Sequence, residues 1–118
     1  MTEAAKVLLT KYAITFLLGA ATFILLDGNP WGWVLAVSIT VATFNYLVGD
    51  YFVLERVGNI AASLTNGLLS AIGAYVVSFL FPSFEARLST ILAFGALVVV
   101  GEYLIHKYLM QSEEVRPS

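Results

Sequence analysis

Four long apolar runs, separated by short polar or turn-forming breaks, constrain this chain more than any other feature of its sequence. Each run has about 19–22 residues, which as an α-helix matches the ~30 Å hydrocarbon core of a bilayer. Because lipid gives the backbone no hydrogen-bonding partner, such runs must be helical. We therefore predict an all-α integral membrane protein, a four-transmembrane-helix bundle within a single domain, residues 1–118. The predicted spans are residues 7–26, 31–49, 60–81 and 88–109, followed by a polar tail, 110–118.

The composition agrees with a membrane protein and argues against several other classes. Of the 118 residues, 59% are hydrophobic and only 12% are charged, whereas a soluble domain is about 45–50% apolar and about 25% charged. So apolar a chain cannot cover a water-facing surface, which argues against a soluble enzyme and a disordered chain. The formal net charge is −2 and no basic stripe is present, so we expect no nucleic-acid partner. The lipid bilayer is the partner that the composition predicts.

Few side chains suited to catalysis are present. The chain has no cysteine and one histidine, His106, which argues against thiolate and multi-histidine metal sites. It has no Gly-x-Ser-x-Gly nucleophile motif and no phosphate-binding loop. Glu102 and His106 would be an acid–base pair without a nucleophile. We therefore expect that the chain is not an enzyme and that it binds no cofactor and no metal.

The distribution of lysine and arginine predicts the orientation. Five of these residues lie on the side of the two termini and the second loop, and one lies on the other side. Since loops rich in Lys and Arg stay in the cytoplasm, both termini should be cytoplasmic. The first run also resembles a signal peptide, with Gly19-Ala20-Ala21 as the cleavage site, but it is a full span long. The five residues are Lys6, Lys11, Arg56, Lys107 and Arg116, against Arg87 alone.

Each run carries one stripe of small or polar residues at helical spacing. Lipid gives no hydrophobic drive for helix association, so helices in membranes meet through small residues and hydrogen bonds. In the first and third runs, helix packing alone is enough to explain the stripes, without a functional role. We expect the stripes to face inward and the aliphatic residues to face lipid. The stripes are Lys11, Thr15, Gly19, Thr22; Ser38, Ala42, Asn45, Gly49; Ser63, Asn66, Gly67, Ser70, Gly73, Ala74, Ser78; and Gly95, Glu102, His106.

Five polar residues are predicted to gather in the cytoplasmic half of the bundle: Lys11, Asp50, Asn66, Glu102 and His106. Ionisable groups inside a bilayer are costly, so each needs a partner or a purpose. In a structural interpretation, Lys11 pairs with Glu102 or Asp50, Glu102 accepts a hydrogen bond from His106, and Asn66 bridges. Alternatively, His106 extends to the membrane interface. In a functional interpretation, Glu102 and His106 form a proton switch near neutral pH.

The segment that joins the second and third runs has a pattern that is met elsewhere. Residues 47–69 read LVGDYFVLERVGNIAASLTNGLL, and the residues that carry the pattern are Gly49, Asp50, Leu54, Arg56, Gly58 and Asn59. This segment resembles the YndM-like family of small bacterial four-span membrane proteins, whose function is uncharacterised. Glu55 stands where that family has proline, and Asn66 stands where it has aspartate. The resemblance implies the four-span fold in a bacterial inner membrane and brings no activity with it. The missing aspartate argues against a proton-coupled role for position 66.

The same segment also has a local physical interpretation, as an inter-span turn formed by Arg56, Gly58 and Asn59. Asp50 would end the second helix and lie close enough to pair with Arg56. Gly58 can take a positive φ, and Asn59 suits the N-cap of the third helix. No chemistry is needed to explain such a turn.

Two classes of function remain open from the sequence. The first is a non-catalytic membrane component, which is a structural, regulatory or partner-binding bundle. The second is a small proton- or ion-coupled transporter or channel that works as an oligomer and uses Glu102 and its neighbours. The outer half offers hydroxyl groups only, so a monomeric channel is disfavoured. The expected protein partners are further copies of the chain or another membrane protein.

Overall fold

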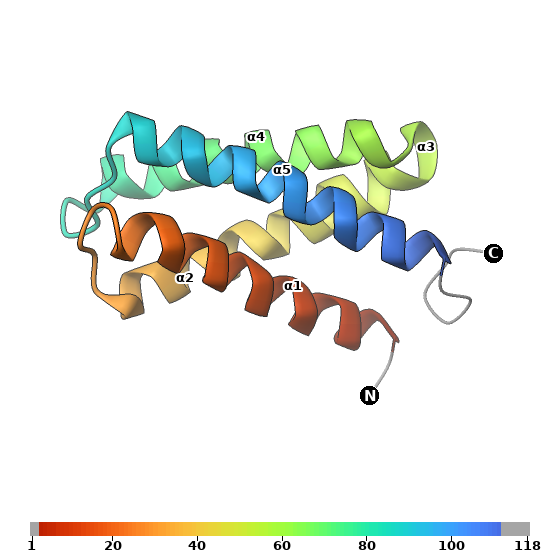
Figure 1. The fold of residues 1–118 in the computed structure, drawn as a ribbon, viewed down its shortest axis with the longest axis horizontal. Coiled ribbons are helices and arrows are strands. Elements are labelled where there is room, and N and C mark those ends of the chain that lie inside the picture. Colours follow the sequence, from red (N-terminus) through yellow and green to blue (C-terminus); the bar gives the residue numbers. More distant parts are fainter. Residues whose placement is uncertain (1–2, 112–118) are drawn as a thin grey trace.

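In the computed structural model of the chain, every secondary-structure element over the described residues, 3–111, is a helix (Figure 1). For residues 3–4, 50–52, 54–55 and 108–111 the structure describes the backbone alone. Four helices are long and apolar enough to cross a membrane, which confirms the predicted all-α class with four candidate spans. The elements are α1 (Glu3–Gly19), η1 (Ala20–Ile24), α2 (Trp31–Phe44), η2 (Asn45–Leu54), α3 (Glu55–Val57), α4 (Asn59–Leu80) and α5 (Leu88–Gln111), where η marks a π-helix.

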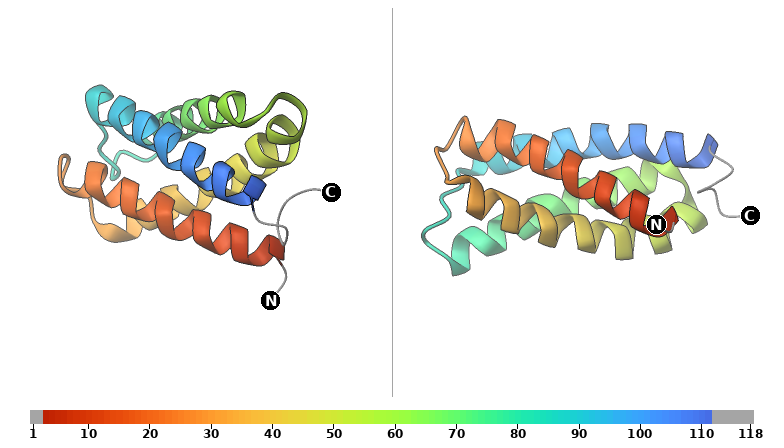
Figure 2. Two further views of the ribbon diagram at one scale, coloured as in Figure 1. Left: turned by 45° about the vertical axis from the view of Figure 1, so that its right-hand side comes forward. Right: turned by 90° about the horizontal axis from the view of Figure 1, so that it is seen from below.

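The four long helices run alternately up and down. α1 begins and α5 ends at the same end of the molecule, where α3 also lies (Figures 1 and 2). The connections 25–30 and 81–87 lie at the opposite end. We call these the termini end and the loop end. The most extensive contact joins α4 to α5, and the next joins α1 to α2. Lys11, Asn66 and Glu102 are therefore all carried on the termini half of the bundle.

The second run differs from its prediction, because the helix does not end at Asp50. It continues as the π-helix η2 to Leu54 and then as α3 to Val57. The chain has no proline there, and the helical path stops only at Gly58, whose φ of +102° and ψ of −177° only glycine adopts readily. Gly58, not Asn59, is the N-cap of α4, and it makes no side-chain capping bond. The expectations that Asp50 ends the helix and that Asn59 caps the next one were wrong.

The predicted stripes face the interior. Every stripe residue is buried except Gly73 and Ser78, which are half-buried. Large apolar side chains such as Leu17, Leu68 and Leu92 lie exposed on the outside, as expected for helices that present their small residues to each other. The core nearest the loop end is aromatic, because the ring centre of Phe23 lies 5.1 Å from that of Phe84 and 4.9 Å from that of Phe94.

Two side chains of the first connection hold the third connection in place. Asp27 accepts hydrogen bonds from Arg87 Nε at 2.7 Å, from the Arg87 backbone N–H at 3.1 Å and from Thr90 Oγ1 at 2.9 Å. Asn29 accepts one from the Glu85 N–H at 2.8 Å. A carboxylate at the start of α5 also complements the positive end of the helix dipole. The loop end is therefore joined by polar contacts across about sixty positions of sequence.

Candidate functional site

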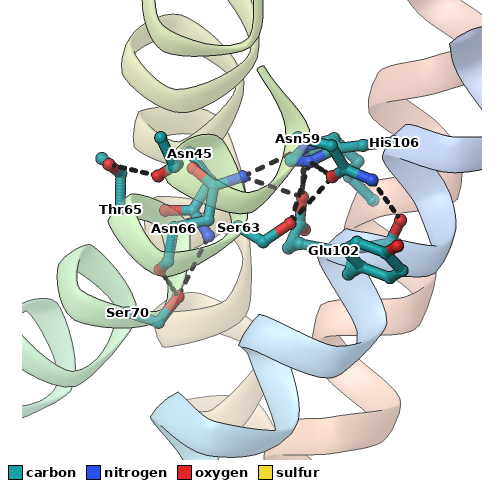
Figure 3. A network of polar contacts seen from close by, with 11 residues as sticks. Asn45, Asn59, Ser63, Thr65, Asn66, Ser70, Glu102 and His106 are labelled. Carbon is teal, nitrogen blue, oxygen red and sulfur yellow. Dashed lines mark hydrogen bonds and ion pairs between the residues drawn. The ribbon is translucent and has the colours of Figure 1, made fainter. Parts of the chain in front are cut away.

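The candidate site is a buried polar cluster centred on the carboxylate of Glu102, on α5. Lys11 of α1 forms an ion pair with Glu102 Oε2 through its Nζ atom. Asn66 of α4 donates from Nδ2 to the same oxygen at 2.9 Å. His106, one turn further along α5, places Nε2 3.2 Å from it. One oxygen atom thus gathers side chains from the first, third and fourth candidate spans (Figure 3 shows the α4 and α5 part).

Burial of the cluster is nearly complete. The side chains of Lys11 and His106 have 0% exposure and that of Glu102 has 4%, and Asn66 is 0% exposed as well. Moving an ion into a low-dielectric interior is expensive unless an opposite charge and hydrogen bonds accompany it. Glu102 has both, so its negative charge is compensated inside the bundle. The burial also excludes the alternative in which His106 extends to the membrane interface.

Asn59 fixes the other side of the His106 ring. Its Nδ2 donates to the carbonyl oxygen of Tyr103 at 3.1 Å, which leaves Oδ1 facing His106 Nδ1 at 2.9 Å. Ser63 donates to the same Oδ1 at 3.0 Å and lies 3.2 Å from Nδ1. An amide oxygen can only accept, so it favours the ring form that carries a proton on Nδ1.

With Nδ1 protonated, His106 Nε2 has a partner in either charge state. In the neutral ring, Nε2 accepts a hydrogen bond, and Asn66 Nδ2 lies 3.4 Å away as a donor. In the imidazolium ring, Nε2 donates, and Glu102 Oε2 lies 3.2 Å away as an acceptor. The surroundings of His106 are therefore compatible with both the neutral and the charged imidazole.

Helical spacing and close backbone contact position these groups. Ser63 and Asn66 are three residues apart on α4, and Glu102 and His106 are four apart on α5, so each pair shares one helix face. Between the pairs and the loop end, the two helices approach closely where Gly67 lies against Gly95. Small residues at that crossing let the polar faces of α4 and α5 meet.

The cluster extends toward η2 through α4. Ser70 donates to the carbonyl oxygen of Asn66 at 2.7 Å, and Asn45 donates from Nδ2 to Ser70 Oγ at 3.0 Å (Figure 3). Asn45 has 0% exposure, and its Oδ1 has no hydrogen-bonding partner among the residues that the structure describes. Gly49 lies so close to Asn66 that a Cβ atom there would overlap the amide. Asn45 thus adds the second candidate span to the network.

The structure brings together most of the predicted cluster. Lys11, Asn66, Glu102 and His106 meet around one oxygen, while the side chain of Asp50 lies outside the described part of the chain. Of the three turn residues, Gly58 has the expected positive φ and Arg56 is exposed. The third, Asn59, belongs to the cluster.

Asn45, Asn59, Ser63 and Ser70 are members of the network that sequence reasoning left out. Three of them lie on the predicted stripes, in register with Asn66, so their spacing was the available signal. Asn59 precedes the third run, where its role was interpreted as capping.

Toward the loop end the cluster gives way to apolar packing. Phe94 and Val98 follow on the inner face of α5, and both are buried in the core with Phe23. Two buried hydroxyl groups in this half bond to their own helices: Thr22 donates to Leu18 O at 3.0 Å and Ser38 to Val34 O at 2.7 Å. Polar contacts between helices and connections are therefore concentrated in the termini half and in the contacts of Asp27 and Asn29 at the loop end.

The fold and this cluster define a class: a small all-helical protein with four helices apolar enough to cross a membrane and a buried charge cluster in one half. Within that class the chain belongs to the family described as "Protein of unknown function (DUF2512)", whose model matches residues 2–116. No curated protein and no solved structure matches the chain. The family match covers almost the whole sequence and brings no activity with it.

Proposed function

We propose that this chain is a non-catalytic component of a bacterial inner membrane, with four spans and both termini in the cytoplasm. The proposal rests on apolar helices of span length and on the excess of Lys and Arg on the side of the termini. A reporter fused after Ser118 should read as cytoplasmic and a reporter inserted at Ser83 as external. The opposite readings would contradict this orientation.

In this proposal the polar cluster holds the bundle together and leaves its surface to contact a membrane partner. The single observation behind it is the Lys11–Glu102 ion pair, which links the first helix to the last and is completed by Asn66 and His106. A carboxylate so fully compensated has no exposed charge to offer a substrate. The partner is either a further copy of the chain or another membrane protein.

The test is flux through proteoliposomes that contain the purified full-length chain. Under the structural proposal, vesicles with the protein take up neither protons nor any member of a broad ion and organic-cation panel faster than empty vesicles. Glu102→Gln vesicles should behave like wild type, although the variant unfolds more easily. Ser89→Ala, a change at an exposed position outside the cluster, is the matched control for reconstitution.

A second candidate function is proton-coupled transport, in which copies of the chain act together. The observation that favours it is the continuous series of contacts from Asn59 through His106 to Glu102, with a partner for each charge state of the imidazole. Uptake that is driven by a pH gradient and abolished in Glu102→Gln would favour this candidate and contradict the first.

A further inference from the structure

An apolar groove runs between the first half of α4 and the second half of α5, on the outside of the bundle. Its volume is about 230 Å³. Ser63 lies buried at its base, next to the polar cluster, while the other lining side chains are hydrophobic or aromatic. The lining residues are Ile60, Ser63, Leu64, Val99, Val100, Tyr103 and Leu104.

The apolar walls of this groove indicate an apolar occupant. The volume would hold several water molecules, but apolar walls give water no hydrogen bonds. Leu64, Val100 and Leu104 are exposed large hydrophobic residues, so the groove opens onto the face that a bilayer would surround. A single acyl chain fits both its chemistry and its direction along the two helices.

Positive charge lies at the termini end of the groove. Lys107 follows Tyr103 by four residues and Leu104 by three, so it shares their face of α5. The Lys107 side chain is exposed. Cations placed at the membrane surface attract anionic lipid headgroups, and Tyr103 is a residue type that favours the same interface.

We propose that this groove binds an anionic phospholipid, with one acyl chain between α4 and α5 and the phosphate beside Lys107. The inference rests on the membrane insertion proposed above. It gives the bundle a lipid site at the level of the Glu102 cluster, which the groove meets at Ser63. Lipid occupancy would then bear on the contact between α4 and α5 that holds Asn66 against Glu102.

A second copy of the chain fits the groove less well. Closed dimers pair the same surface patch of both copies. Across a membrane such a pairing brings the two Lys107 side chains to the same end of one interface. Like charges there repel, whereas a phosphate group at that position is attracted.

The test is native mass spectrometry of the full-length chain in mild detergent, titrated with phosphatidylglycerol or phosphatidylcholine that carry identical acyl chains. Wild type should bind phosphatidylglycerol about fivefold more tightly, the ratio expected for one cation near a headgroup. Lys107→Gln should remove most of that preference, while Lys6→Gln, at the same end of the bundle on α1, should keep it. Equal affinity of wild type for the two lipids would overturn the proposal.

Groove-filling variants test the acyl-chain half of the proposal. Val100→Trp should weaken binding of both lipids at least fivefold. Its control is Leu92→Trp, because Leu92 lies on the same helix, outside the groove, and has the same 60% exposure. Leu64→Trp fills the groove from α4 and replaces Val100→Trp if that variant does not fold. Identical lipid binding by the groove and control variants would overturn the proposal, as would a dimer that only the groove variants dissociate.

Failure of the lipid site can be told apart from failure of the proposed function. Vesicles that contain the protein are washed with alkaline carbonate before the titrations. A chain that stays in the washed vesicles yet shows no lipid preference overturns the groove proposal alone. A chain released by the wash contradicts membrane insertion, and with it both proposals.

Discussion

Gly67 of α4 and Gly95 of α5 bring the backbones of their helices into direct contact. A Cβ atom added to Gly67 would lie 2.8 Å from the carbonyl oxygen of Gly95 and would also overlap Val99. The obstacle is backbone, which cannot rotate away as a side chain can. Gly67 directly follows Asn66, so this crossing sets how closely α4 approaches Glu102 on α5.

Gly67→Ala should therefore destabilise the bundle by about 1–3 kcal/mol, the usual cost of inserting atoms into a well-packed contact. Thermal unfolding in detergent, followed by circular dichroism, measures the change. Gly32→Ala is the matched control, because a Cβ atom at Gly32 meets nothing within 4 Å. Gly32→Ala should be neutral or slightly stabilising, since alanine is the better helix former. Equal effects of the two changes would contradict the close crossing.

The inward faces of the helices could be predicted from the sequence because lipid imposes a simple rule on packing. Small and polar residues must face other helices, and the stripe through Ser63, Asn66 and Gly67 does so. The same rule brought Lys11, Glu102 and His106 to one point. Their types and spacing therefore carried enough information to predict most of the cluster.

Other features depend on information that periodicity does not hold. Asp50 and the polar residues that follow it indicated the end of the second helix, so its continuation through η2 and α3 was missed. Asp27 and Asn29 looked like turn formers, but their partners Arg87 and Glu85 lie about sixty positions away. Asn59 has the residue type of an N-cap, yet its side chain bonds to His106 across the helix contact. Only the three-dimensional arrangement reveals such pairs.

Removing both partners of the Lys11–Glu102 pair should cost less stability than the sum of the costs of removing each one. Lys11→Met or Glu102→Gln alone leaves a buried charge without its counter-ion, and such changes in buried pairs cost about 3–5 kcal/mol. In the double variant no ion of this pair remains, so its cost should be smaller than the sum of the single costs by at least about 1 kcal/mol. Unfolding free energies of the four proteins in detergent measure the coupling.

Lys6→Met is the control for losing a cation from α1, because Lys6 is exposed. Its cost should stay within about 0.5 kcal/mol, as for other surface changes. Strict additivity of Lys11→Met and Glu102→Gln would contradict a direct interaction between the two side chains.

Gly58→Ala should destabilise the turn before α4 by about 1–3 kcal/mol. The φ of +102° with ψ of −177° at Gly58 belongs to a region that is essentially reserved for glycine. A Cβ atom at Gly58 would meet no neighbour within 4 Å, so the cost would come from the backbone alone. Val57→Ala, at an exposed neighbouring position, should change the midpoint of thermal unfolding little. A Gly58→Ala protein as stable as Val57→Ala would contradict this backbone conformation.

The hydrogen bonds that Asp27 accepts at the loop end should make the stability of the fold depend on pH in the acid range. Burial alone would raise the pKa of Asp27, but hydrogen bonds from Arg87 and Thr90 outweigh it and hold the pKa below its usual value. A carboxyl group with a lowered pKa in the folded state stabilises the fold above its unfolded pKa, near 3.9. That contribution is lost as the pH falls from about 4 through the lower, folded pKa.

Asp27→Asn should thus lower the free energy of unfolding by about 1 kcal/mol at pH 7. The effect is small because Arg87 is 66% exposed, so solvent screens its attraction for Asp27. The variant should also lose stability less steeply than wild type between about pH 5 and pH 2. Unfolding midpoints in detergent across that range measure both effects. Glu85→Gln removes an exposed carboxylate of the same loop end and should leave the acid dependence of wild type intact. Parallel pH profiles for wild type and Asp27→Asn would mean that this carboxylate does not hold the two connections together.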